Sequence, residues 1–350
     1  MLINDVDSDV TLWGKNMSKS PVAWALFVEH ADGPFVLREL ALPQAGKGQV
    51  LVRIKASGVN PLDTKIRAGN APHAQVQLPA ILGLDLAGTV EAVGLDVTAF
   101  KTGDEVYGMA GGIGALQGTL ATHMVADADL LALKPRNLSA REAAAIPLVF
   151  ITAWEGLVDR ARVHAGQKVL IHAGAGGVGN AAVQIAHAFA AQVFATVSAG
   201  KRKIVEECGA TPINYQAQNV DEYLAEHTGS EGFDVVYDTV GGATLDDSFL
   251  AAKTHTGHVV SCLGWGTHKL APLSFRGATY SGVFTLLPML TGKGRAHHGE
   301  ILREATKLAE AGKLTPLLNQ KRFTFDDVQE AHAAVQSGKT IGKVVVEIDG

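Results

Sequence analysis

The chain has 350 residues, of which 47% are hydrophobic and 19% charged, and its formal net charge is −5. This length exceeds the roughly 250 to 300 residues that one hydrophobic core usually serves, so two domains are expected. The mild acidity and the lack of a long basic stripe give nucleic-acid binding little support. Two cysteines argue against a disulfide framework, and no apolar run approaches the roughly 20 residues that span a membrane. We therefore expect a cytoplasmic protein that binds neither nucleic acid nor membranes.

The first part of the chain has the pattern of a β domain. Residues 1–20 are polar and acidic, which predicts a loose extension. From about residue 21 to residue 130, short apolar runs alternate with glycine, which is typical of a barrel-like domain. Ser139 and Glu142 then have the spacing of a capping box before a helix, and Pro147 interrupts the next apolar stretch. We interpret this change as a domain crossing.

The second part of the chain alternates strands with helices. Between residues 167 and 264, short apolar runs alternate with helical stretches, which predicts βαβ units and a parallel sheet. Residues 300–313, "EILREATKLAEAGK", predict a helix because their hydrophobic side chains fall on one face. The run "KVVVEI" predicts a closing strand. The expected fold class is α/β, with a doubly wound parallel sheet and a second, β-barrel domain.

A glycine cluster follows the first strand of the parallel sheet. In "HAGAGGVG", Gly174, Gly176 and Gly179 fit the pattern G-x-G-x-x-G between the strand "KVLIHA" and an amphipathic helix. Glycines let the backbone approach a pyrophosphate, whose charge the helix N-terminus attracts. A plain glycine turn is the alternative. The context favours the dinucleotide-binding loop of a Rossmann fold, whose expected cofactor-binding residues are Gly174, Gly176, Gly177, Val178 and Gly179.

The end of the second strand indicates which dinucleotide would bind. A Rossmann fold that prefers NAD usually carries Asp or Glu there, to accept hydrogen bonds from the ribose. This chain reads "ATVSAGKRK", in which Ser198 is followed by Lys201 and Arg202. These cations could neutralise a 2′-phosphate, which a carboxylate would repel. The sequence therefore favours NADPH, with Ser198, Lys201 and Arg202 at its phosphate.

Several motifs together resemble one superfamily. The stretches "GVNPLDTKIRAG", "ILGLDLAGTVEAVG", "HAGAGGVG", "DVVYDTVGG" and "GKVVV" follow the order and spacing of the medium-chain dehydrogenase/reductase superfamily over residues 22–347. The resemblance implies a GroES-like catalytic domain (1–147 and 289–350) around a Rossmann domain (148–288). It also implies an active site in the cleft between the two domains.

Two replaced residues indicate the branch of the superfamily. Zinc-dependent members carry Cys and His where this chain has Asn60 and Leu84, so no metal is expected. Without a Lewis acid, acceptors that need only positioning and a hydrogen-bond donor fit best. The resemblance to the zinc-independent quinone oxidoreductases implies an NADPH-dependent oxidoreductase that transfers hydride to a quinone or another activated carbonyl. Two alternatives stay open: an enone or enal double-bond reductase, and an NADPH-binding structural or regulatory protein without turnover.

The expected catalytic residues are Asn60, Asp63 and Lys65. The Asn60 amide could donate to a substrate oxygen, although Asn also suits the turn in "SGVNP". Related quinone reductases often carry Tyr at the position of Lys65, which leaves the proton donor open between Lys65 and solvent. Through the resemblance, further cofactor contacts are expected from Thr152, Tyr215, Leu263, Gly264, Phe284 and Lys343. The expected residues of the substrate pocket are Asn60, Met109, Phe150, Trp265 and Phe284.

An apolar segment suggests an assembly. The run "YSGVFTLL" is expected to form an edge strand, which would pair with its two-fold mate in a homodimer. The alternative is that Phe284, Leu286 and Leu287 fold inward and that Pro288 ends the strand.

Overall fold

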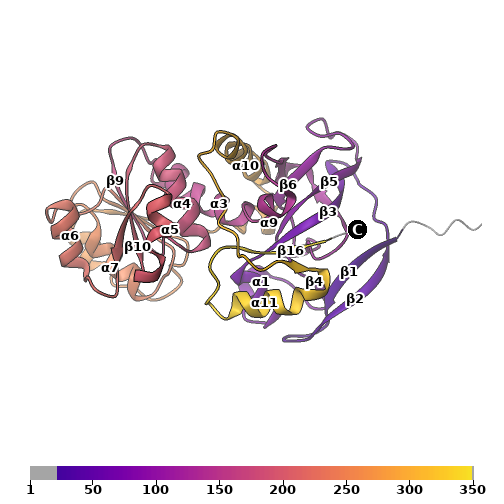
Figure 1. Cartoon of the computed structure of the whole chain (residues 1–350), viewed down its shortest axis with the longest axis horizontal. Coiled ribbons are helices and arrows are strands. Elements are labelled where there is room, and N and C mark those ends of the chain that lie inside the picture. The colour runs from indigo at the N-terminus through magenta and orange to yellow at the C-terminus, as the bar shows by residue number, and fades with distance from the viewer. Residues whose placement is uncertain (1–21, 349–350) are drawn as a thin grey trace, which may run out of the picture.

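The computed structural model describes residues 22–348, so the extension expected at residues 1–20 lies outside the described residues. Figure 1 shows a Rossmann-type domain on the left and a β-rich domain on the right. The expected α/β fold, a Rossmann sheet beside a GroES-like domain, is confirmed. Within the described residues, no helix is long and apolar enough to cross a membrane.

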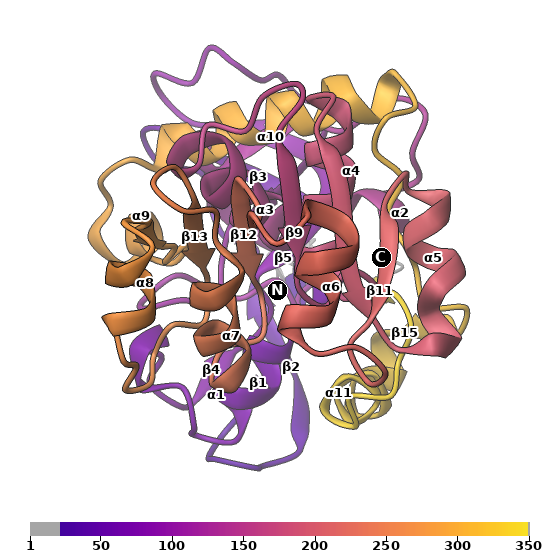
Figure 2. The same cartoon turned by 90° about the vertical axis from the view of Figure 1, so that its left-hand side faces the viewer.

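A six-stranded parallel sheet forms the first domain, in the strand order β11-β10-β9-β12-β13-β14. Figure 2 shows β13, β12 and β9 side by side. The order reverses at β9, and the carboxyl ends of strands at such a reversal are where ligands bind in open α/β sheets. The strands are β9 (Lys168–Ile171), β10 (Gln192–Val197), β11 (Thr211–Asn214), β12 (Val235–Asp238), β13 (His258–Ser261) and β14 (Thr279–Gly282). The helices of this domain are α4 (Gly177–Ala188), α5 (Arg202–Glu207), α6 (Val220–Thr228), α7 (Ala243–Ala251) and α8 (Ala271–Phe275), with the 3-10 helix η4 (Ala199–Lys201).

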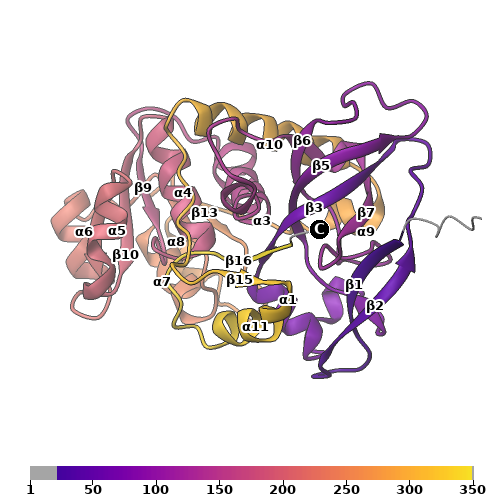
Figure 3. The ribbon, with the colours of Figure 1, turned by 45° about the vertical axis from the view of Figure 1, so that its right-hand side comes forward.

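Antiparallel strands dominate the second domain. A seven-stranded sheet has the order β15-β16-β3-β5-β6-β8, with β7 paired to β3, and a three-stranded sheet has the order β2-β1-β4. Its strands are β1 (Val22–Val28), β2 (Phe35–Ala41), β3 (Gln49–Val59), β4 (Ala80–Ile81), β5 (Asp85–Val93), β6 (Glu105–Met109), β7 (His123–Asp127), β8 (Leu131–Leu133), β15 (Phe323–Thr324) and β16 (Val344–Glu347). Figure 3 shows β16 running between β15 and β3, so late residues of the chain complete a sheet that begins early.

Alternation of residue types explains β3, the longest strand of this sheet. Val50, Val52 and Ile54 are at most 1% exposed, whereas Arg53 and Lys55 keep contact with water. The outward side chains pair across the sheet surface, with Arg53 3.1 Å from Glu91 on β5. The period-2 alternation therefore matches the buried face of this stretch, apart from Leu51, which is also buried.

Helices join and cover the two domains. They are α1 (Pro61–Arg67), α2 (Ala140–Ala143), α3 (Pro147–Trp154), α9 (Leu287–Thr291), α10 (Arg295–Glu310) and α11 (Val328–Gln336). Shorter helical turns are η1 (Pro72–Ala74), η2 (Ala128–Leu130), η5 (Phe325–Asp327) and the π-helix η3 (Glu155–Arg160). Ser139 caps α2 through a capping box with Glu142, as the spacing predicted. The limits of the two domains, at residues 147/148 and 288/289, stay a prediction.

The expected edge strand over residues 280–287 is shorter than the sequence suggested. β14 ends at Gly282, although it does lie at the edge of the parallel sheet. Leu286 is only 5% exposed, and Leu287 begins α9 with 54% of its surface exposed. The chain turns inward after Gly282, which brings the next residues to the domain junction rather than to the sheet edge.

Candidate active site

A cleft of about 440 Å³ lies between the two domains, at the carboxyl ends of the parallel strands. One wall is the glycine-rich turn between β9 and α4, and the other is the start of α1 with the residues that precede β16. Apolar side chains make up much of the remaining surface, among them Leu62, Trp265, Phe284 and Leu286. A concave, largely apolar site with a few polar groups is the usual form of a ligand site.

The cleft gathers most of the predicted site residues. Those that line it are Asn60, Lys65, Thr152, Gly176, Gly177, Val178, Gly179, Lys201, Leu263, Trp265, Phe284 and Lys343. Those that do not line it are Asp63, Met109, Phe150, Gly174, Ser198, Arg202, Tyr215 and Gly264. Some residues of the second group pack behind the lining of the cleft, and the others lie away from it.

The glycine turn has the shape needed to hold a pyrophosphate. A Cβ added at Gly179 would lie 2.2 Å from the carbonyl oxygen of Ala173, and one at Gly174 would lie 2.6 Å from Cβ of Ala195. Both glycines therefore allow the strand, turn and helix to pack closely. Gly176 and Gly177 are exposed at the start of α4, where the first N–H groups have no partner within the helix. Such a turn fits a dinucleotide phosphate group, because glycines without a Cβ let a phosphate approach the backbone N–H groups.

The three residues expected at a 2′-phosphate differ in position. Lys201 lines the cleft, whereas Arg202 forms an ion pair with Glu206, with 2.7 Å between Nε and Oε1. Ser198 precedes η4 and lies outside the lining. Tyr215 is 58% exposed and borders an adjoining pocket of about 780 Å³. Lys201 is thus the cation best placed for a phosphate in the cleft.

A buried polar cluster lies at the start of α1. Asn60 donates from Nδ2 to Oδ2 of Asp85 over 2.9 Å, and Nζ of Lys343 donates to Oδ1 of Asn60. Lys343 also lies 3.7 Å from Oδ2 of Asp85. Asp63 accepts a hydrogen bond from the backbone N–H of Asn60 over 2.8 Å. We name these four residues, Asn60, Asp63, Asp85 and Lys343, the buried quartet.

The buried quartet fixes the orientation of the Asn60 amide. A lysine cation requires the amide oxygen to face it, and a carboxylate requires the amide nitrogen. Lys343 contacts the oxygen of the Asn60 amide and Asp85 its nitrogen, so the two requirements agree on one orientation. Asp63 accepts its hydrogen bond from the backbone N–H of Asn60, so the side-chain amide of Asn60 takes no part in that bond. Asn60 lines the cleft and has one amide N–H without a partner among residues 22–348, so it can donate a hydrogen bond to a ligand.

Burial changes the proton affinities of the buried quartet. Desolvation raises the pKa of Asp63 from 3.8 to about 7, against the hydrogen bond from Asn60, which lowers it. Burial also raises the pKa of Asp85 and lowers that of Lys343, while their mutual attraction opposes both changes. Oδ1 of Asp63 is buried without a hydrogen-bond partner. A carboxyl group with a pKa near neutrality is suited to holding or exchanging a proton during catalysis.

Two predicted pocket residues lie in the hydrophobic core. Met109, at the end of β6, is 0% exposed, and Phe150, on α3, is also 0% exposed and stacks on Trp154 at 5.7 Å. They differ from the expected position because an apolar residue in an apolar segment is more often packed inside than turned to a ligand. Gly264 also lies outside the lining, where an added Cβ would lie 2.2 Å from the Tyr280 hydroxyl.

The sequence missed an aromatic contact across the cleft. His73, on η1, packs edge-on against Trp265 with ring centroids 4.5 Å apart, and 6.4 Å from Phe284. Nε2 of His73 is buried without a hydrogen-bond partner. Burial, and secondarily Lys65, lowers the pKa of His73, which favours the neutral imidazole. No motif surrounds His73, so only the fold could bring it to this wall.

The residues that replace the zinc ligands are not arranged to bind a metal. Asn60 is engaged in the buried quartet, and Leu84 is 0% exposed in the core. Among residues 22–348, no group of three or more His, Cys, Asp or Glu side chains could hold a metal ion.

The comparisons with known proteins agree with this architecture. Residues 46–136 match the alcohol dehydrogenase GroES-like domain, and residues 208–346 match the family described as zinc-binding dehydrogenase. A crystal structure of an alcohol dehydrogenase superfamily protein from Novosphingobium aromaticivorans is 57% identical, with a TM-score of 0.91 over 93% of this chain and 100% of that chain.

Two curated relatives carry names that state an activity. The 2-methylene-furan-3-one reductase of Solanum lycopersicum is 36% identical over 315 residues, which cover 88% of this chain and 74% of the relative. The quinone oxidoreductase of Homo sapiens is 30% identical over 328 residues, which cover 92% of this chain and 97% of the relative. The chain therefore belongs to the medium-chain dehydrogenase/reductase superfamily of oxidoreductases, in its zinc-independent, quinone oxidoreductase-like branch.

Proposed function

We propose that this oxidoreductase uses NADPH to reduce quinones or other activated carbonyl compounds. One observation carries the proposal: the glycine turn, Lys201 and the Asn60 amide all line the same apolar cleft. A flat, conjugated acceptor suits these apolar walls, and its carbonyl oxygen suits a fixed N–H donor. The relative from Homo sapiens is named as a quinone oxidoreductase, which agrees with this acceptor class.

The preference for NADPH rests on charge. No carboxylate follows Val197 at the end of β10, and Lys201 lines the cleft only four residues later. Arg202 is occupied by Glu206, so we assign the phosphate contact mainly to Lys201. The backbone N–H groups of Gly177 and Val178 at the start of α4 would hold the pyrophosphate.

The chain's own groups stabilise charge and manage protons. Bound NADPH would supply a hydride to the acceptor. Asn60 would donate its free N–H to the acceptor oxygen, on which negative charge grows, and the buried quartet would keep the amide in that orientation. Lys65 is exposed on α1 at the edge of the cleft, where its cation attracts the same oxygen. Apolar side chains such as Trp265 and Phe284 would exclude water from the acceptor.

A matched acceptor panel tests the proposal. NADPH consumption would be followed with quinones and with enones of similar size, each also with NADH. We expect turnover of quinones and at least tenfold tighter binding of NADPH than of NADH, measured by fluorescence titration. Equal affinity for the two cofactors would contradict the cofactor assignment.

Reduction of an enone double bond is the second candidate. The relative from Solanum lycopersicum is named as a 2-methylene-furan-3-one reductase, and that substrate contains an alkene conjugated to a carbonyl. The fixed Asn60 donor would serve an enone oxygen as well as a quinone oxygen. A preference of more than tenfold for enones in kcat/KM would reverse the order of the two candidates.

We also propose a homodimer built along the exposed edge of the parallel sheet. β14 is the last strand of that sheet, and nearby Leu270 and Phe275 are 57% and 86% exposed. Val283 is 5% exposed and lines the cleft, so it is a poor probe of this edge. Sedimentation at micromolar concentration should show a dimer, and Phe275→Lys should weaken it. A monomeric wild-type chain would overturn the assembly.

A further inference from the structure

A line of polar side chains leads from the cleft into the junction of the two domains. Thr152 and Thr285 line the cleft, with their hydroxyl oxygens 3.2 Å apart. The Thr285 hydroxyl also lies 2.8 Å from Oε2 of Glu155. On the far side, Oε1 of Glu155 lies 3.4 Å from Nε2 of His298. We name Thr152, Thr285, Glu155 and His298 the junction chain.

The fold holds the junction chain in a shielded position. Glu155 begins η3 directly after α3, and His298 belongs to α10, which packs against α3 where the domains meet (Figure 1). The side chain of His298 is 0% exposed, and neither of its ring nitrogens has a hydrogen-bond partner in residues 22–348. Glu155 keeps 17% of its side chain exposed, which allows the pair to exchange a proton with water. Burying a histidine without a hydrogen-bond partner costs free energy, and the contact with the Glu155 carboxylate offsets part of that cost.

The protonation of Glu155 sets the direction of the Thr285 hydroxyl. A hydroxyl has one proton, so Thr285 can donate either to Glu155 or to Thr152, but not to both. When Glu155 is ionised, the carboxylate takes that donation. When Glu155 is protonated, it donates to Thr285, whose own proton then points to Thr152 or into the cleft.

Other titratable groups near Glu155 do not compete for this role. Tyr237, on β12, donates to the carbonyl oxygen of Thr152 over 2.7 Å, and burial raises its pKa far above the ordinary value. Burial likewise raises the pKa of Cys262 to about 12. Asp159, one helical turn after Glu155, is bound at 2.8 Å to the exposed His297. Glu155, with His298 behind it, is therefore the titratable group that contacts the Thr285 hydroxyl.

We propose that the junction chain is a proton relay, in which Glu155 and His298 are positioning residues that supply the proton consumed by the reduction. The proposal rests on the proposed function, in which a hydride brings two electrons to the acceptor and leaves it as an anion. The Thr285 O–H bond breaks as the new bond from hydrogen to the acceptor forms. Thr285 recovers a proton from Glu155, and the Glu155–His298 pair recovers one from water. Charge and protons then balance over the cycle.

The test uses the full chain with NADPH and its best acceptor. We expect Glu155→Gln and Thr285→Val to lower kcat at least tenfold, because an amide or a methyl group cannot pass the proton on. For Glu155→Gln, the dependence of kcat on pH should change, and added imidazole or formate should restore part of kcat. NADPH affinity by fluorescence titration should stay within twofold of wild type. His298→Asn should also lower kcat and respond to the same buffers.

Matched controls lie on the same two helices. Asp159→Asn and His297→Asn remove the exposed pair beside the junction chain and should leave kcat within twofold of wild type. Unchanged kcat and pH dependence in Glu155→Gln would overturn the relay alone. A loss of kcat in that variant with an unchanged pH profile and no rescue would also overturn it, since that is the signature of a structural role. No wild-type turnover with any acceptor would overturn the proposed function and the relay together.

Discussion

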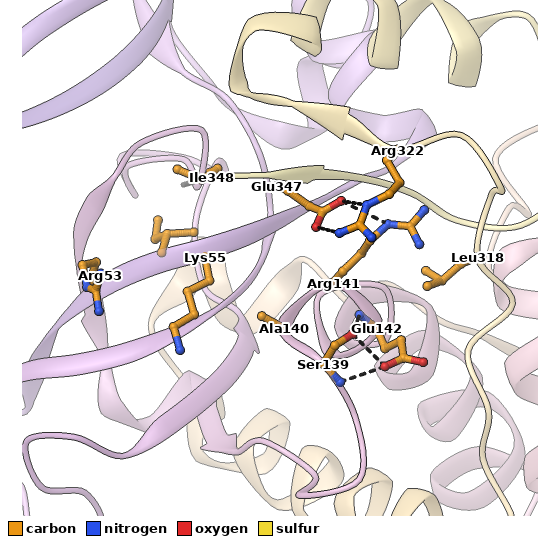
Figure 4. A pocket seen from close by; sticks show the side chains of 11 residues that line it. Arg53, Lys55, Ser139, Ala140, Arg141, Glu142, Leu318, Arg322, Glu347 and Ile348 are labelled. Carbon is orange, nitrogen blue, oxygen red and sulfur yellow. Dashed lines mark hydrogen bonds and ion pairs between the residues drawn. The ribbon is translucent and has the colours of Figure 1, made fainter. Parts of the chain in front are cut away.

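Two pockets of similar size differ in how deeply their charged side chains are buried. The cleft between the domains has about 440 Å³, and a second pocket beside α2 and β16 has about 520 Å³. Figure 4 shows the second pocket, in which Arg322 and Arg141 converge on Glu347. The Arg322 side chain is 71% exposed, whereas those of Glu347 and Arg141 are 20% and 16% exposed. At the cleft, Lys343 is 9% exposed and Asp85 is 0% exposed.

This difference in burial distinguishes an ion pair at the surface from a site whose charges are held inside the protein. An exposed pair contributes little to stability, because water already solvates both charges. A buried pair costs desolvation and persists only with good geometry and supporting hydrogen bonds. The buried quartet has such support, since Asn60 bonds both Lys343 and Asp85. Pocket volume alone would not have distinguished the two regions, whereas the burial of their charges does.

Removing one cation from each pocket should give the largest contrast. Lys343→Met leaves Asp85 buried without its cation, so we expect the free energy of unfolding at pH 7 to fall by about 3 to 5 kcal/mol. Arg322→Met should cost less than about 1 kcal/mol, because the Arg322 side chain is mostly exposed and Arg141 still pairs with Glu347. Urea unfolding of both variants measures the difference. Equal losses would show that the two regions are held in the same way.

The pH dependence of stability should have opposite signs at Asp63 of the buried quartet and at Glu142 of the second pocket. The pKa of Asp63 is raised to about 7, so its contribution is full below pH 3.8 and is lost as pH rises toward 7. Asp63→Asn mimics the protonated acid and should stabilise the fold at pH 8 by up to about 4 kcal/mol, with little change at pH 4.

Glu142 in the second pocket provides the matched control. The hydrogen bonds from Ser139 lower its pKa, so its contribution is present above pH 4.5 and is lost as pH falls. Glu142→Gln should therefore destabilise the fold slightly at pH 8 and have less effect at low pH. Urea unfolding at both pH values checks both variants. A destabilised Asp63→Asn at pH 8 would contradict the assignment of Asp63 as a carboxyl group whose pKa burial raises.

The smallest expected effect compares neighbouring cations inside and outside the cleft. Lys201→Ala should weaken NADPH binding by about 1.5 to 3 kcal/mol, the range for a hydrogen bond to a charged group, and leave NADH binding unchanged. Arg202→Ala should change NADPH binding less than threefold, because Arg202 already pairs with Glu206. Fluorescence titrations with both cofactors measure this. A larger effect at Arg202 would move the phosphate away from the assigned position.

Local patterns predicted the fold well. The capping box of Ser139 and Glu142 and the glycine turn before α4 depend on neighbouring residues, and the structure has both where the sequence indicated. The end of β14 was less predictable, because the inward turn after Gly282 depends on the domain junction. An apolar run has the same composition in an edge strand and in a segment that folds into a junction.

The candidate site was predictable only in part, because its partners are far apart in the chain. Asn60 was expected at the site from its motif, but its bond to Lys343 joins residues 283 positions apart. Asp85 lies in the stretch "ILGLDLAGTVEAVG", which gave no reason to expect it at the site, and the structure shows that it completes the buried quartet. His73 and Thr285 reached the cleft through folding alone. Met109 was expected in the substrate pocket but lies in the core, because the hydrophobicity of a side chain does not distinguish a pocket wall from a core.

The distance along the chain between Asn60 and Lys343 has a consequence for biosynthesis. During translation, the segment with Asn60, Asp63 and Asp85 leaves the ribosome long before Lys343, and the whole parallel sheet is made in between. Domains generally fold as units as they emerge. In the nascent β-rich domain, the carboxyl groups of Asp63 and Asp85 therefore have no cation beside them until β16 has been made and pairs with β3. Proton uptake by these carboxyl groups would let the early segment collapse before its lysine has been synthesised.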